Sequence, residues 1–222
     1  MFQSLVLYTQ ELTKLKRFYM NVLQLDITNV TAEKFTVTIG SSSITFKLFD
    51  EPAFYHFAIN IPGNQFSQMK YWITEKIKLN RDRGRDEIYF PNFDADSMYF
   101  YDAGGNIVEL IGRRNRDMFG DLTSAAFLNV SEIGIVTPYV AEIGERLQDL
   151  GIPLNGSTEI NPHGINFLGR DDAFIVLVPP ERQWFFSDKK AQVFPLEIVL
   201  TNGQHLQLDH EGKLHVKNEE NS

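Results

Sequence analysis

The stretch that decides the fold is Tyr99-Phe100-Tyr101-Asp102-Ala103-Gly104-Gly105-Asn106-Ile107-Val108-Glu109-Leu110-Ile111. Its aromatic and β-branched residues favour two β-strands. The Asp-Ala-Gly-Gly-Asn segment between them supplies residues that tolerate the positive φ angles of a tight turn. The stretch therefore predicts a β-hairpin.

Glu109 is the unusual residue of this hairpin, because it is a carboxylate in an otherwise apolar strand. Alternation places Ile107, Glu109 and Ile111 on one face and Val108 and Leu110 on the other. Since both faces are apolar, Glu109 is expected to be covered, and a buried carboxylate needs a cation, a hydrogen-bond donor or a proton. The alternative is a glutamate at the strand end that reaches solvent or a nearby arginine.

The hairpin pattern Tyr-x-x-Asp-x-x-Gly-Asn-x-x-Glu-Leu, from Tyr99 to Leu110, resembles the closing hairpin of the vicinal oxygen chelate superfamily. That superfamily includes glyoxalase I, extradiol dioxygenases, fosfomycin-resistance enzymes and bleomycin-resistance proteins. The resemblance implies that Glu109 is a metal ligand, as the equivalent glutamate is in metal-binding members. Ala103 stands where the family usually has proline, a change that affects the stiffness of the turn more than its chemistry.

The composition excludes several classes of function. The formal net charge of −8 argues against a general nucleic-acid binder. The chain has no cysteine, so a disulfide framework, a thiol nucleophile and a cysteine-ligated metal are excluded. The N-terminal sequence lacks the pattern of a signal peptide, and no apolar run is long enough for a membrane span. A soluble cytoplasmic protein that does not associate with membranes is expected.

The chain predicts an α+β fold of tandem βαβββ units that form cupped mixed sheets, with a truncated second domain. The predicted strands cover residues 2–9, 25–30, 34–39, 43–49, 54–61, 87–90, 97–101, 107–111, 131–137, 164–168, 173–178, 194–201, 205–209 and 214–216, and the predicted helices cover residues 10–23, 66–79 and 138–150.

These elements divide into two domains. Residues 1–112 are expected to form one domain of two βαβββ units, each giving half of a cupped sheet. Residues 113–130 are interpreted as a linker whose arginines lie in solvent. Residues 131–222 form a second, incomplete domain of one βαβββ unit, a strand and a C-terminal hairpin. An incomplete sheet leaves an open edge, so we expect a homodimer that covers it.

A metal site is the main functional hypothesis. His56 matches the superfamily's histidine position on the opening strand of the second unit, and with Glu109 it could share a divalent ion such as Zn, Mn, Fe or Ni. The third ligand stays open between Ser4, Glu132 and water, and Ser4, at the matching position of the first unit, is a poor ligand. Glu132 and Glu197 occupy opening-strand positions of the later units, and exposed carboxylates at sheet edges are the preferred interpretation of both.

The resemblance implies three alternatives for function. The first is a metal-dependent lyase or isomerase that acts on a small oxygen-containing substrate, with Glu109 and Tyr99 as catalytic residues. The second is a metal-free binding protein of the bleomycin-resistance type, with a cup that holds an apolar or planar ligand. The third is a structural protein with a filled cup. Strand alternation gives Tyr8, Asn60 and Tyr101 as substrate-binding residues. Extradiol dioxygenase activity is not expected, because Ser4 and Asn92 stand where that motif needs histidines.

Overall fold

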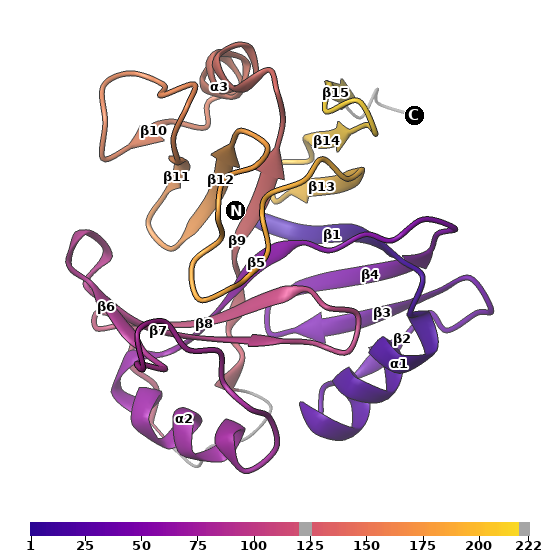
Figure 1. Ribbon diagram of the computed structural model, residues 1–222, viewed down its shortest axis with the longest axis vertical. Helices are drawn as coiled ribbons and strands as arrows, with labels where there is room; N and C mark the ends of the chain where they lie inside the picture. The colour runs from indigo at the N-terminus through magenta and orange to yellow at the C-terminus, as the bar shows by residue number, and fades with distance from the viewer. Residues whose placement is uncertain (120–125, 218–222) are drawn as a thin grey trace.

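The computed structural model describes residues 1–119 and 126–217, which form two curled sheets (Figure 1). The first sheet has seven strands among these residues, in the spatial order β15 (Leu214–Lys217), β14 (His205–Leu208), β13 (Leu196–Leu200), β1 (Phe2–Thr9), β4 (Ser42–Leu48), β3 (Lys34–Ile39) and β2 (Ile27–Thr28). The second sheet has eight, in the order β10 (Leu154–Asn155), β11 (Asn166–Arg170), β12 (Ala173–Val178), β9 (Asn129–Val136), β5 (His56–Pro62), β8 (Ile107–Arg113), β7 (Ala95–Tyr101) and β6 (Ile88–Phe90).

Helices connect the strands within each unit. The described α-helices are α1 (Leu12–Arg17), α2 (Phe66–Thr74) and α3 (Val140–Asp149), and shorter helical turns are η1 (Phe18–Val22), η2 (Gly63–Gln65) and η3 (Pro91–Phe93). The first predicted helix is split, because α1 passes into the π-helical turn η1. None of the helices in the described part of the chain has the length and apolar character needed to cross a membrane. The expected α+β fold of βαβββ units is confirmed.

The pairing of the units differs from the expected one. The second unit joins the third through the antiparallel pair β5–β9, and the first unit joins the C-terminal strands through the antiparallel pair β1–β13. In Figure 1 the indigo N-terminal strands therefore lie beside the yellow C-terminal strands. The expectation that the first two units share one cupped sheet is wrong, because each unit finds its partner strand in the other half of the chain. The division into two domains and the homodimer stay predictions. The homodimer was predicted because an incomplete sheet leaves an open strand edge, and the pairs β5–β9 and β1–β13 now cover that edge within one chain.

One hydrophobic core joins the two sheets. It includes Leu5 and Phe46 from the first sheet and Phe57 and Leu110 from the second, all fully buried. The other faces of the sheets differ. In β1 buried residues alternate with half-buried ones, whereas every residue of β5 is buried. The connection between β12 and β13 covers the outer face of the second sheet with Trp184 and Phe186.

The hairpin that closes the second unit is held by Asp102. Its carboxylate accepts hydrogen bonds from the backbone N–H of Gly104 and Asn106, both at 2.9 Å, and from the hydroxyl of Tyr19 at 2.8 Å. Gly105 has a φ of +81°, which favours glycine. The turn is therefore fixed by hydrogen bonds despite the alanine in place of proline, and it sets the register of β7 against β8.

The prediction of a solvated linker over residues 113–130 is wrong at its first residue, Arg113. It is the last residue of β8 and is 3% exposed, whereas the sequence interpretation placed it in solvent. The strand runs two residues further than predicted because Arg113 pairs with Ala95 of β7. Most of the remaining predicted linker lies in the described residues 114–119 and 126–130, and positions 120–125 lie outside them.

Candidate functional site

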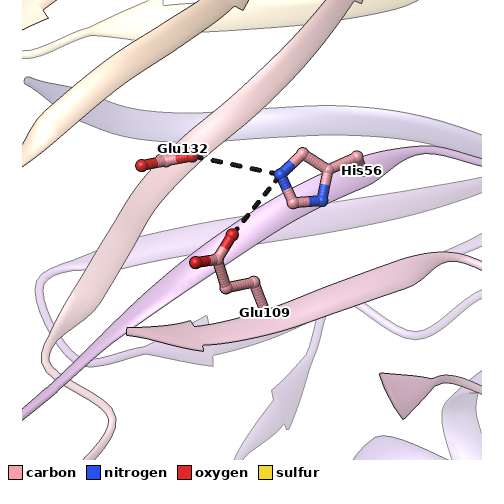
Figure 2. A group of neighbouring side chains, drawn as sticks. All are labelled: His56, Glu109 and Glu132. Atoms are coloured by element: carbon pink, nitrogen blue, oxygen red, sulfur yellow. Dashed lines mark ion pairs between the residues drawn. The ribbon is translucent and has the colours of Figure 1, made fainter. Parts of the chain in front are cut away.

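Three side chains converge on the covered face of the second sheet (Figure 2). His56 comes from β5, Glu109 from β8 and Glu132 from β9. The Nε2 atom of His56 lies 3.6 Å from Oε2 of Glu109 and 3.9 Å from Oε2 of Glu132. The predicted convergence of His56 and Glu109 from adjacent strands is thus confirmed.

The strand register explains why these residues meet. Ala58 of β5 is paired with Glu109 on one side and with Glu132 on the other, and His56 precedes Ala58 by two positions on the same face. The register between β5 and β9 shifts after Ala58, so Ser131 has no partner across the pair. Such a bulge redirects the side chains around it.

His56 is oriented by the backbone. Its Nδ1 atom lies 3.3 Å from the carbonyl oxygen of Ile107, so the tautomer with the proton on Nδ1 donates a hydrogen bond there. Nε2 is then left with its lone pair toward the two carboxylates. The ring packs against Trp184, with centroids 4.9 Å apart. A backbone acceptor on the second ring nitrogen is the usual support of a metal-binding histidine.

The two carboxylates are buried together, with Glu109 3% and Glu132 4% exposed. Burial raises the pKa of Glu109 to about 7, the negative charge of Glu132 acts in the same direction, and His56 opposes both. Two like charges and little water make the metal-free site electrostatically costly. A cation or a proton between the carboxylates relieves that cost.

Tyr99 lies beside Glu109, its partner in the register of β7 and β8. Burial raises the pKa of Tyr99 well above its ordinary value, and the charges of Glu109 and Glu132 raise it further. Its ring stacks on Phe186 at 4.9 Å with an interplanar angle of 7°. Tyr99 therefore presents a protonated hydroxyl at the edge of the His56, Glu109 and Glu132 cluster.

A cavity of about 250 Å³ opens onto these residues. Most of its lining is aromatic or aliphatic, and the polar groups are gathered at the cluster and at Asn92. The lining residues are His56, Phe90, Pro91, Asn92, Phe93, Tyr99, Glu109, Ile111, Glu132, Ile165, Phe167, Val176, Trp184 and Phe185. Phe90, Phe167 and Trp184 were not identified from the sequence, because nothing local in it shows that β6, β11 and the β12–β13 connection meet at one cavity.

The residues predicted to bind substrate lie elsewhere. Tyr8 belongs to the first sheet and donates a hydrogen bond to Glu197 at 2.9 Å. The Asn60 amide donates to the Asp172 carbonyl at 2.9 Å, and the Tyr101 hydroxyl donates to Asp188 at 2.5 Å. None of the three lines the cavity, since the alternation argument assumed a cup made by the first two units.

The three candidates for a third ligand, Ser4, Glu132 and water, stay predictions, and the structure places the two residues differently relative to His56. Ser4 lies on β1 in the first sheet, away from His56. Glu197 lies on β13 of the same sheet, where Lys47 contacts it at 3.2 Å. Glu132 is the candidate whose side chain lies beside those of His56 and Glu109. The interpretation of Glu132 as an exposed edge carboxylate is wrong, because β9 lies in the middle of its sheet.

The donor set suits a divalent cation. One ligand atom from each of His56, Glu109 and Glu132 can be chosen so that all three lie within 4.8 Å of one another. Within residues 1–119 and 126–217, no other three histidine, aspartate or glutamate side chains form such a group. One imidazole and two carboxylates match first-row ions that accept mixed nitrogen and oxygen ligands. The two negative charges balance a doubly charged ion.

Comparison with a family model gives a match over part of the chain. Residues 130–182 match the family described as toxoflavin-degrading enzyme. That segment begins in β9, includes Glu132, and continues through α3 and β12. No curated protein sequence matches the chain.

Solved structures resemble the fold more extensively. A Bacillus subtilis protein with a suggested dioxygenase activity has a TM-score of 0.57 and 14% identity, over 80% of this chain and 63% of that one. Lactoylglutathione lyase from Agrobacterium tumefaciens gives 0.44 and 16%, over 52% of this chain and 95% of its own. The fosfomycin resistance protein FosX from Listeria monocytogenes, complexed with Mn(II) and a dihydroxypropylphosphonic acid, gives 0.39 and 17%, over 56% and 93%. At these identities the likeness concerns the fold.

Proposed function

Since the chain has the fold of the vicinal oxygen chelate superfamily, we propose that it is a divalent-metal-dependent enzyme, a lyase or isomerase that acts on a small oxygen-containing substrate. The observation that carries the proposal is the orientation of His56. Its Nδ1 is occupied by the Ile107 carbonyl, and its Nε2 faces one oxygen of each buried glutamate. A histidine that served only the core would not need two buried carboxylates in front of it.

His56, Glu109 and Glu132 would hold the ion, and Zn²⁺, Mn²⁺, Fe²⁺ and Ni²⁺ all accept this donor set. A divalent ion bound there supplies Lewis-acid polarisation of substrate oxygens. The chain's own groups then orient the substrate and handle protons. Tyr99 stays protonated, and its hydroxyl, which hydrogen-bonds the Glu109 carboxyl group, can donate to a substrate oxygen when it is released from Glu109. Glu109, whose pKa is raised to about 7, can exchange a proton near neutral pH when it is not engaged as a ligand.

The cavity supports a flat, largely apolar substrate. An apolar cavity of about 150 Å³ is enough to hold benzene, so the roughly 250 Å³ here suits a ring system somewhat larger than one benzene ring. Trp184, Phe90 and Phe167 offer faces and edges for stacking. No lysine or arginine among the described residues lines the cavity, which disfavours phosphonates and other anionic substrates unless the ion itself binds them.

The experiment combines metal titration with a substrate screen. Metal-free protein is loaded with Zn²⁺, Mn²⁺, Fe²⁺ or Ni²⁺ and incubated with toxoflavin and with other planar compounds that carry adjacent oxygen donors. The match of residues 130–182 is the reason to include toxoflavin. We expect metal-dependent consumption of at least one compound, and its loss in Glu132→Gln. Glu197→Gln is the matched control, because it removes a carboxylate charge from the other sheet.

The alternative function is a metal-free binding protein that uses the same cavity. The aromatic lining favours it, and one proton shared at the Glu109–Glu132 pair would replace the ion. In that case planar ligands bind equally well with and without a chelator, and no compound is consumed. Metal-independent binding without turnover would thus reject the enzyme proposal and support this one.

A further inference from the structure

Arg113 is the buried cation nearest to the proposed ligands. Its guanidinium lies against a pair of aromatic rings that contact each other, with Cζ 5.7 Å from the centroid of Phe93 and 5.6 Å from that of Phe174. Nη2 donates to Oγ of Ser131 at 3.2 Å, and that hydroxyl in turn donates to the Asp172 carbonyl at 2.9 Å. The guanidinium is therefore held by packing against this aromatic pair and by a hydrogen bond at one end.

The two carboxylate oxygens of Glu132 face different neighbours. Its Oε1 lies 3.8 Å from Nη2 of Arg113, and its Oε2 lies 3.9 Å from Nε2 of His56. The bulge at Ser131 explains this arrangement, because the extra residue in β9 brings Ser131 and Glu132 to the same guanidinium. One oxygen of Glu132 thus faces a fixed positive charge, and the other faces the cluster.

From this geometry we propose that Arg113 is a positioning residue for the metal site, one that keeps Oε1 of Glu132 occupied so that Oε2 alone is presented beside His56 and Glu109. The proposal rests on the proposed function, since it assumes that the cluster binds a divalent ion. Arg113 does not line the cavity, and Glu132 is the proposed ligand with which it forms an ion pair.

A role in packing alone does not explain why the residue at position 113 is charged. Arg113 keeps Nε and Nη1 buried without a hydrogen-bond partner among the described residues. A buried cation with two unpaired donors is costly, and a purely apolar residue packed against Phe93 and Phe174 would avoid that cost. The charge is explained if it serves Glu132.

The test uses Co²⁺ alone as the probe, because its visible absorption weakens as the number of ligand atoms rises. Wild type, Arg113→Met, Arg113→Gln and Arg113→Lys are titrated with Co²⁺, and both the dissociation constant and the band intensity are recorded. Loss of a residue that supports a metal ligand typically weakens metal binding by about 10- to 100-fold. We expect a loss of that size in the methionine and glutamine variants, together with a weaker band as the freed Glu132 uses both oxygens. Lysine should restore part of the affinity, since it keeps a positive charge.

The control is Arg116→Met, which removes an equal charge from an arginine that pairs with Asp172 at 2.5 Å and contacts neither glutamate. Its Co²⁺ affinity and spectrum should equal those of wild type. If Arg113→Met fails to fold, Arg113→Gln carries the test, because its amide can still donate to Ser131. Variants that fold with wild-type affinity and spectrum would overturn the inference, whereas a wild type that binds no Co²⁺ would overturn the proposed function instead.

Discussion

Glu109 and Glu132 lie on opposite sides of the same strand, each paired in register with Ala58 of β5. Their carboxylates converge with His56 on the covered face of the sheet. The two glutamates belong to different βαβββ units, so the site exists only because the second and third units share a sheet. A proton or a divalent ion is the natural occupant of such a position.

The first prediction concerns the stability of metal-free protein as a function of pH. The pKa of Glu109 is raised from an ordinary value of 4.5 to about 7 in the folded state. Between these two values the folded protein holds more protons than the unfolded chain, so the contribution of Glu109 to stability is lost as pH rises and stays lost above pH 7. Glu109→Gln, measured by urea unfolding with a chelator present, should therefore be more stable than wild type at pH 8, by on the order of 2–3 kcal/mol.

That advantage should shrink as pH falls from 7 and should be gone below pH 4.5, where the wild-type carboxyl is largely protonated in both states. Glu145→Gln, at an exposed position of α3, is the matched control and should show no such trend. A Glu109→Gln variant that is less stable than wild type at pH 8 would mean that the carboxylate has a partner strong enough to repay its burial.

A second prediction tests which of the two sheets holds the metal site. Glu132→Gln should abolish the rise in melting temperature caused by Mn²⁺ or Zn²⁺, because a neutral amide cannot balance the charge of the ion. Glu197→Gln and Ser4→Ala should retain the full rise, since both residues lie in the first sheet. The reverse pattern in thermal denaturation would assign the metal to Glu197 and remove the site described above.

A third prediction is that the iron-loaded protein does not cleave catechols. Oxygen-activating non-haem iron sites commonly use two histidines and one carboxylate, whereas this cluster has one histidine and two carboxylates. Asn92 lines the cavity at the place where the ring-cleaving motif needs an acid–base histidine. Oxygen consumption with catechol should stay at the level of the Glu109→Gln variant, and turnover above it would refute this expectation.

A fourth prediction uses the two tryptophans of the chain, Trp72 and Trp184. Trp184 lines the cavity and packs on His56, whereas Trp72 packs on Phe127 outside it. In a Trp72→Phe variant, a planar ligand that enters the cavity should quench most of the remaining fluorescence. A Trp184→Phe variant should show little change with the same ligand. Equal quenching in both variants would indicate binding elsewhere.

Much of the fold could be predicted from the sequence because the strands carry strong local signals. The strands at residues 2–9, 34–39 and 173–178 were predicted with the bounds that the structure has. The hairpin around Asp102 resembles the closing hairpin of the vicinal oxygen chelate superfamily and thereby indicated the fold, and Glu109 stands out because it interrupts an apolar strand. These features are encoded within a few neighbouring residues, so no knowledge of distant contacts was needed.

The remainder of the site depends on contacts between distant parts of the chain. Which unit pairs with which is decided by the fit of β5 against β9, and periodicity within one strand cannot show it. For that reason Glu132 was assigned to an edge and Tyr8 to the cup. Arg113 was placed in a solvated linker for another reason, since its burial depends on a pairing with Ala95 of β7 beyond the predicted end of the strand. The only local hint of burial at Arg113 was that it directly continues an apolar strand.

The most direct test of the metal site is the metal content of protein purified without a histidine tag. Elemental analysis should find about one equivalent of a divalent first-row ion in wild type and in Glu197→Gln, as expected for a site with one imidazole and two carboxylates. Glu109→Gln and Glu132→Gln should contain almost none. Wild-type protein that contains no metal, and whose melting temperature is unchanged by Zn²⁺, Mn²⁺ and Fe²⁺, would contradict the proposal that His56, Glu109 and Glu132 form a metal centre.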